Sequence, residues 1–263
     1  MLSLSNFQPF ESDKLIRMGA SHDGGYLIPS DINAQLLISF GLGDDWKFEL
    51  DMVSNGYVNK FIVFDHTVSL LNNLNRVTNL LKYKSFKLSA LIYRIIVLWK
   101  YFFYFTFLGN IHISKKITGK GSKKSLLRNN EINLHEIFDL YVSNSKVSVI
   151  LKVDIEGSEY EIIEQILGHS DQIVLLIIEF HSIHEEELLF NNSLKLIKSK
   201  YSLVHTHFNN YSKLHKDLIP NVVEFTFLNK SLFKEKNKVA KLPKLGFDSP
   251  SAPLRPDFNI VFN

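Results

Sequence analysis

Cysteine is missing from this chain of 263 residues. Its absence excludes a disulfide scaffold, a cysteine-ligated zinc site and catalysis by a thiol. The N-terminal segment also lacks a basic stretch followed by an apolar one, so we expect no secretory signal peptide and a cytoplasmic location. Internal repeats and a second domain boundary are absent too. The sequence therefore predicts one domain over residues 1–263.

A strong net charge is absent as well. The chain has 30 Lys and Arg against 27 Asp and Glu, a formal net charge of +3. This mild balance does not predict a nucleic-acid partner. The lysines cluster locally, at residues 115–124 and again at 230–244. Each cluster could form a basic surface for an anionic substrate or a membrane, or it could be a solvated loop.

The stretch "VILKVDIEGSEYEII" carries the strongest pattern in the chain. Residues 147–153 are apolar and β-branched with one lysine, which is typical of a strand buried on both faces. Asp154 and Glu156 follow directly, and Ser158 is expected to cap a helix over residues 159–167. Ligands bind at this end of the strands in an open α/β sheet. The alternative is that both acids only stabilise the start of the helix.

A glycine-containing turn stands earlier in the chain. A predicted strand, residues 36–40, leads into Gly41 and Gly43, and a second strand, residues 59–64, ends at Asp65. Glycines let a backbone approach a nucleotide-like cofactor, and an acid about 20 residues later can bind ribose hydroxyls. These residues alone do not distinguish one such cofactor from another. The other elements we predict are helices at 46–55, 68–82, 132–141 and 185–199, strands at 173–180, 201–208 and 222–228, a polar lead-in at 1–20 and a tail ending in an edge strand.

Four stretches together resemble one enzyme family. "LKVDIEGSEYEII", "GGYLIP" at 24–29, "SFGLGDDWKFE" at 39–49 and "FDHT" at 64–67 are similar in order and spacing to the FkbM-type methyltransferases, which depend on S-adenosylmethionine (SAM). These are largely O-methyltransferases of sugars and natural products. The resemblance implies a doubly wound, Rossmann-like α/β fold of the class I methyltransferase type, with a mostly parallel sheet. It also implies SAM as cofactor and a small hydroxylated acceptor, for which we favour a nucleotide-activated or surface-polysaccharide (capsule or lipopolysaccharide) sugar.

The resemblance adds residues to the cofactor site. It implies that Arg17, Asp23 and Gly25 lie beside the cofactor, together with Gly41, Gly43 and Asp65 of the pattern above. Asp23 could accept hydrogen bonds from an amine, whereas the alternative for this segment is a plain turn. Ser39 stands where the family pattern usually has an acid ahead of the first glycine.

Residues 88–108 form an apolar segment long enough to cross a bilayer. Arg94 and Lys100 oppose a span, since each costs about 2.5–3.5 kcal/mol at a helix centre. We rank a helical insertion that covers the active site or forms a homodimer face first, an interfacial membrane helix second and a true span last. With the basic loop that follows, the insertion is expected to occupy about residues 83–125.

Acids and histidines end three of the predicted strands. Asp154 and Glu156 follow one, Glu179 and His181 close the next, and His207 lies at the end of a third. Because these ends meet at one sheet edge, we predict that Asp154, Glu156, His181 and His207 are catalytic. We also predict that Asp154, Glu179 and His181 could bind a divalent Mn, Fe or Mg ion. The alternative for each histidine is a structural role.

The chemistry of an alcohol acceptor agrees with this cluster. A hydroxyl is a poor nucleophile until a base or a metal lowers its pKa. The sequence therefore predicts a SAM-dependent O-methyltransferase acting on a sugar. Two alternatives stay open: an NAD-dependent nucleotide-sugar oxidoreductase or epimerase, and a membrane-associated nucleotide-binding protein.

Overall fold

A computed structural model describes residues 2–12, 14–82, 87–108, 110–119, 130–142, 144, 146–239, 241–244 and 246–262. Most of the predicted basic loop, including Lys120, Lys123 and Lys124, lies outside the described residues.

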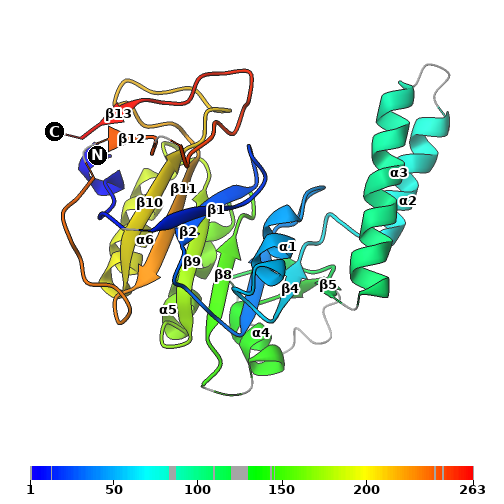
Figure 1. Cartoon of the computed structure of the whole chain (residues 1–263), viewed down its shortest axis with the longest axis horizontal. Coiled ribbons are helices and arrows are strands. Elements are labelled where there is room, and N and C mark those ends of the chain that lie inside the picture. The colour runs from blue at the N-terminus through cyan, green and yellow to red at the C-terminus, as the bar shows by residue number, and fades with distance from the viewer. Residues whose placement is uncertain are drawn as a thin grey trace.

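A seven-stranded sheet runs through the molecule in the order β10-β11-β9-β8-β3-β4-β5 (Figure 1). Its strands are β3 (Leu36–Phe40), β4 (Lys60–Phe64), β5 (Ile111–Ile113), β8 (Val149–Val153), β9 (Ile173–Phe180), β10 (Tyr201–Phe208) and β11 (Val223–Asn229). The first five of these pair in parallel, and β11 pairs antiparallel with both β9 and β10. The prediction of a doubly wound, mostly parallel α/β fold is confirmed.

The central strand β8 shows why the sheet is buried on both faces. Its residues Val149, Leu151 and Val153 pack into a core with the helices α4 (Leu134–Tyr141), α5 (Ile163–Gly168) and α6 (Glu187–Lys200). Ile150 points to the opposite core, formed with helix α1 (Lys47–Ser54). Each such apolar side chain contributes about 1.5–3 kcal/mol when it is fully buried. Lys152 lies on the α1 side as well, which makes it the exception in this strand.

The N-terminal segment differs from the polar lead-in that we predicted. It forms a short 3-10 helix, η1 (Leu4–Phe7), and a strand β1 (Leu15–Gly19) that pairs antiparallel with β2 (Gly25–Pro29). Phe7 is fully buried and stacks on Phe190 of α6. The hairpin covers the α1 side of the sheet, where the Thr226 hydroxyl donates to the carbonyl of Leu27 at 2.8 Å. The short strand β1 carries too weak an alternation to be seen in the sequence.

A helical hairpin between β4 and β5 projects beyond the edge of the sheet (Figure 1). It consists of α2 (Leu70–Lys82), α3 (Leu88–Phe102) and a π-helical turn η2 (Phe103–Phe107). The insertion therefore begins before residue 83, because the predicted amphipathic helix is its first arm. By length and composition, residues 88–107 could cross a membrane, and 11% of an 18-residue window in this segment is buried.

Two further predictions change in detail. The tail does form a strand, β13 (Ile260–Val261), but it pairs with β12 (Lys241–Leu242) in a small sheet of its own and not with the central sheet. A second small sheet consists of β6 (Lys116–Ile117) and β7 (Glu131–Ile132). The helix after Asp154 begins as a 3-10 turn, η4 (Glu159–Ile162), and Ser158 makes no side-chain cap. The carboxylate of Glu159 instead stabilises the turn before the helix, because it accepts from the N–H groups of Ile155 and Gly157 at 3.2 and 3.1 Å.

Candidate active site

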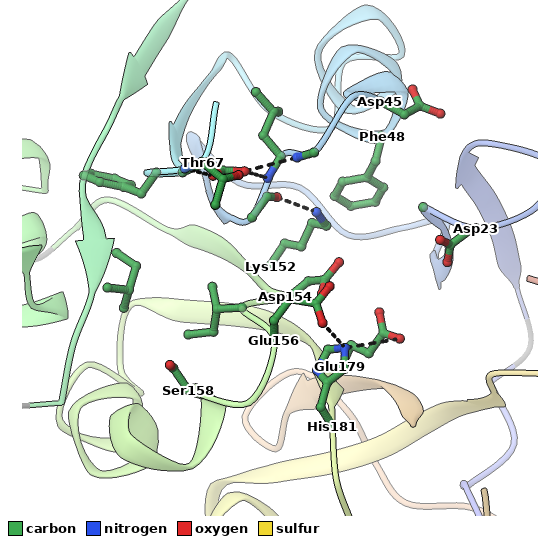
Figure 2. Close-up of a pocket in the computed structure, with 18 of the residues that line it drawn as sticks. Asp23, Asp45, Phe48, Thr67, Lys152, Asp154, Glu156, Ser158, Glu179 and His181 are labelled. Atoms are coloured by element: carbon green, nitrogen blue, oxygen red, sulfur yellow. Dashed lines mark hydrogen bonds and ion pairs between the residues drawn. The ribbon is translucent and has the colours of Figure 1, made fainter. Parts of the chain in front are cut away.

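A cleft of about 580 Å³ opens at the C-terminal ends of β3, β4, β8 and β9 (Figure 2). Its size is that of a ligand site, and its position is where open α/β sheets bind ligands. From the cofactor and acid–histidine sets predicted above, the cleft is lined by Asp23, Gly41, Gly43, Asp65, Asp154, Glu156, Glu179 and His181. None of the described residues of α2 and α3 lines it, whereas Lys115 and Lys116, which follow the two helices in the predicted insertion, do line it.

The glycine loop after β3 approaches β8 closely. Gly41 has a φ of 81°, and a Cβ there would lie 1.9 Å from the carbonyl oxygen of Asp154, so only glycine fits. Gly43 has a φ of 60°, and a Cβ there would meet no atom within 4 Å. The loop therefore presents bare backbone to the cleft at Gly43, as a nucleotide-like cofactor requires.

Asp65 closes this loop at the end of β4. Its Oδ2 accepts the N–H groups of Leu42 and Gly43 at 2.9 and 3.1 Å, and its Oδ1 accepts the N–H and the hydroxyl of Thr67, both at 2.7 Å. Burial opposes ionisation, but these four hydrogen bonds together lower the pKa of Asp65. Asp65 lies where a ribose-binding acid was predicted. In this structure, however, both of its carboxylate oxygens accept hydrogen bonds from the protein itself and so stabilise the glycine loop.

Glu49, a buried acid on α1, contacts the side chain of Ser39. The Ser39 hydroxyl donates to Oε1 of Glu49 at 2.6 Å, and the ammonium of Lys152 lies 3.7 Å from the same oxygen. Lys152 also donates to the carbonyl of Gly41 at 2.9 Å. The acid that the first strand lacks is thus supplied by the helix that follows it. Our sequence interpretation missed both Glu49 and Lys152.

The turn between β1 and β2 brings Asp23 into the cleft but not its two predicted companions. The guanidinium of Arg17 donates to the carbonyl oxygens of Ala20 and His22 at 2.9 and 2.7 Å. A Cβ at Gly25 would lie 2.0 Å from the carbonyl oxygen of Ala20. Arg17 and Gly25 are absent from the lining of the cleft and shape the turn instead. Burial, with Glu224 and Asp154 nearby, raises the pKa of Asp23 to about 6.

Asp154, Glu156 and His181 form the compact core of the acid–histidine cluster (Figure 2). One potential ligand atom from each lies within 4.8 Å of the others. Nδ1 of His181 donates to Oε1 of Glu159 at 2.8 Å, which leaves Nε2 at 3.5 Å from Glu156 and 4.0 Å from Glu179. Glu156 therefore completes the trio in place of Glu179, whose carboxylate accepts from the Asn209 amide at 3.0 Å. Glu156 has a φ of 55°, a strained conformation for this residue type that is typical of functional sites.

Negative charge dominates the interior of this cluster. Burial raises the pKa of Asp154, although Lys152 and His181 oppose this effect. Burial, and then the charges of Asp154 and Glu224, raise the pKa of Glu179. Burial lowers the pKa of His181, but its hydrogen bond to Glu159 outweighs this and raises the value overall. The site thus favours binding of a cation.

His207 lies apart from the cleft. It is buried between Glu224, 3.3 Å from Nδ1, and Asp257, 3.4 Å from Nε2. Burial opposes its protonation, but these two acids raise the pKa of His207 well above the usual range. The predicted catalytic histidine is therefore an ion-paired residue outside the cleft lining. Lys115 and Lys116, which we assigned only to a basic surface, do line the cleft.

The strand order and the glycine loop define a class I methyltransferase fold. The methyltransferase FkbM domain matches residues 40–229, most of the chain. The chain belongs to the FkbM family of methyltransferases, and it is a SAM-dependent methyltransferase. This assignment leaves the NAD-dependent alternative without support.

Solved structures of other methyltransferases are similar to this chain at low identity. A Streptococcus pneumoniae protein described as a tRNA (m1A22) methyltransferase, in complex with SAM, is 9% identical over 75% of this chain and 67% of its own, with a TM-score of 0.37. TrmK of M. capricolum, bound to S-adenosyl-homocysteine, is 12% identical over 76% and 65%, with a TM-score of 0.35. A protein of an E. coli prophage described as a DNA modification methyltransferase is 11% identical over 76% and 48%, with a TM-score of 0.40. The comparison with curated proteins returns no match.

The charges of the cleft predict an unusual dependence of stability on pH. A raised carboxyl pKa means that the folded state holds its proton more tightly than the unfolded chain does. Such a carboxyl group stabilises the fold fully at a pH below its pKa in the unfolded chain, and this stabilisation is lost as the pH rises through its pKa in the folded protein. A raised pKa therefore makes the folded protein less stable as the pH rises. This applies to three carboxyl groups, Asp23, Asp154 and Glu179, and to two imidazoles, His181 and His207. Burial lowers the pKa of His112 and that of His169, which acts in the opposite direction, but fewer groups contribute to it. We therefore expect a higher Tm near pH 6 than near pH 8 for the ligand-free protein.

Thermal unfolding measured across this range checks the expectation. Glu179→Gln removes one of the contributing carboxyls and should flatten the slope. Asp31→Asn, at an exposed acid outside the cleft lining, should leave the slope unchanged. A Tm that rises from pH 6 to pH 8 would contradict the pKa directions given for the cluster.

Proposed function

We propose that this enzyme transfers the methyl group of SAM to a hydroxyl of a sugar in the cytoplasm, and that the sugar is a nucleotide-activated or surface-polysaccharide building block. The observation that carries the proposal is the cluster of Asp154, Glu156 and His181 at the cleft. Asp154 follows β8 and contacts the glycine loop through its backbone, so acid and cofactor loop are adjacent. An acceptor hydroxyl bound beside this cluster would have a base within reach of its proton.

The residues of the cleft suit the proton transfer. SAM, when bound, supplies a methyl group made electrophilic by a sulfonium. The buried carboxylate of Asp154 has a raised pKa, which makes it a stronger base than a solvated aspartate. His181 is held by Glu159 with its Nε2 toward the carboxylates, so it can stabilise their charge or pass a proton between them and water. The acid-rich surroundings also favour a cationic cofactor.

The same trio fits a divalent ion. Two carboxylates and one imidazole suit Mn²⁺, Fe²⁺ or Mg²⁺ better than a structural zinc. The Nδ1–H of His181 donates to the carboxylate of Glu159, as metal-bound histidines commonly do through their second nitrogen. An ion held by Asp154, Glu156 and His181 would lower the pKa of an acceptor hydroxyl.

Two lysines in the cleft favour an acceptor that carries phosphate. Lys115 and Lys116 follow β5 and line the same cleft as the acid cluster. A cleft lined by both acids and two lysines matches a molecule with a neutral hydroxylated part and an anionic part. A nucleotide-activated sugar has both parts. The charge pattern of the cleft thus supports this acceptor over a free sugar.

Calorimetry followed by an acceptor screen tests the proposal. SAM should bind to metal-stripped protein and NAD⁺ should not. Methyl transfer should occur with nucleotide sugars and not with the matching free sugars, and the product should carry an O-methyl group. Chelation should lower the rate and Mn²⁺ should restore it. Transfer only to amines would overturn the hydroxyl assignment, and full activity in chelator would overturn the metal.

A further inference from the structure

Positive charge is concentrated in the stretch of sequence that contains the projecting hairpin. Residues 66–130 hold twelve of the 30 Lys and Arg residues and none of the 27 Asp and Glu residues. The rest of the chain is consequently acidic. The hairpin α2–α3, residues 70–108, lies inside this acid-free stretch. Such an uneven distribution favours contact with an anionic surface.

One face of α3 is apolar and exposed. Leu88, Ile92, Ile95, Trp99 and Phe102 follow one another at spacings of four and three residues, which places them along one stripe of the helix. Each is at least 48% exposed, and Trp99 is 61% exposed. Soluble proteins rarely expose a continuous apolar stripe of this length, so a partner is expected to cover it.

Aromatic rings extend this stripe into the π-helical turn. Trp99 stacks on Phe103 with ring centroids 5.4 Å apart, and Phe103 stacks on Phe107 at 5.5 Å. Phe107 is 73% exposed. Tryptophan and other aromatic side chains are typical of helices that lie at the boundary between lipid headgroups and acyl chains.

The other face of α3 contacts the glycine loop and the core on the α1 side, and these contacts are incompatible with a helix that crosses a membrane. Arg94 pairs with Asp44 of the glycine loop, as Arg76 of α2 does. Val97 and Tyr101 are buried in the core on the α1 side, and Trp46 packs edge-on against Tyr101. A spanning helix would have to break these contacts, whereas a helix that lies flat in the interface keeps them and buries only its free stripe.

A second copy of the chain is a poorer partner for this surface. A twofold interface would place two acid-free, cation-rich hairpins against each other, and like charges repel across such a contact. An anionic lipid surface matches both features at once, since its headgroups attract the lysines and its acyl region accepts the stripe. We propose that the α2–α3 hairpin docks this enzyme on anionic membranes. The inference does not depend on the proposed acceptor.

Vesicle binding of the full chain tests the proposal. Vesicles of phosphatidylcholine alone are compared with vesicles that also contain phosphatidylglycerol, and co-sedimentation gives the partition coefficient. The wild-type protein should bind the anionic vesicles, and added salt should weaken that binding. Ile92→Glu/Trp99→Glu should lower the coefficient by roughly tenfold or more, because two large apolar side chains leave the interface.

Matched variants separate the hairpin from general effects. Leu188→Glu/Leu189→Glu introduces the same charges at an exposed apolar pair on α6 and should bind as wild type does. Lys82→Ser/Lys87→Ser should weaken binding, whereas Lys213→Ser/Lys216→Ser should not. Unchanged SAM affinity in each variant shows that the fold is intact.

Three results would overturn the proposal. The first is a wild-type protein that binds neither kind of vesicle. The second is equal binding by wild type and Ile92→Glu/Trp99→Glu. The third is a dimer in light scattering that this double variant converts to a monomer, which would make a second copy the partner of the stripe.

Discussion

Asp154→Asn is expected to lower kcat by about 10²–10⁴-fold, the range that general acid–base catalysis supplies. The change keeps the size of the side chain and removes its charge. It therefore removes a base and a ligand atom from the cluster with Glu156 and His181. A methyl-transfer assay at saturating SAM and acceptor measures the effect, and calorimetry separates it from a loss of SAM binding.

The same variant should unfold at an equal or higher temperature. Burial and neighbouring acids disfavour the ionised form of Asp154 in the folded protein, so a neutral amide removes an unfavourable charge. A functional residue that costs stability is expected to behave in this way. Asp31→Asn, the same change at an exposed site, should alter neither property. Activity at the wild-type level in Asp154→Asn would remove this residue from the catalytic site.

The sequence was sufficient to predict the central sheet and the edge of that sheet at which the cleft lies. Strand β8 and its neighbours are continuous apolar runs, which only a sheet buried on both faces requires. Polar residues that follow such runs must meet at one edge of the sheet, and Gly41, Asp65, Asp154 and His181 do line one cleft. Their roles in catalysis and cofactor binding stay predictions until the variants are measured.

Contacts that depend on tertiary packing could not be predicted. Glu49 lies on a helix whose pattern does not show that one acid points inward, and it reaches the site only because α1 packs on β3 and β8. His207 ends a strand as His181 does, but β10 lies two strands beyond β9, and the C-terminal tail brings Asp257 against it. Position at a strand end therefore identifies candidates, whereas strand order decides which of them meet.

The hairpin shows a similar limit. Its first arm, α2, has an ordinary amphipathic pattern, which in an α/β fold usually indicates packing on the sheet. In this chain α2 packs with α3 instead, and Leu71, Leu74 and Leu81 stay exposed. Periodicity reports that a helix has an apolar face, but it does not report what covers that face.

Lys152→Met is expected to lower the free energy of unfolding by about 3–5 kcal/mol, the cost of breaking a buried ion pair by removing one partner. The side chains of Lys152 and Glu49 are 6% and 1% exposed, so the carboxylate would be left without a counter-ion and without water. Burial opposes the charge on Lys152, but Glu49 and other acids raise its pKa, so Lys152 is protonated in the native protein. Denaturant unfolding measures the loss.

A double variant shows whether the pair itself is responsible. Glu49→Gln removes the uncompensated charge and can still accept from the Ser39 hydroxyl, so Lys152→Met/Glu49→Gln should lose much less stability than the two single changes combined. Lys146→Met, at an exposed position just before β8, serves as the matched control and should unfold as wild type does. SAM affinity should fall in Lys152→Met, because the Gly41 carbonyl loses its donor and the glycine loop is no longer tied to β8. Equal stability of Lys152→Met and Lys146→Met would show that the buried ammonium does not hold α1, the loop and β8 together.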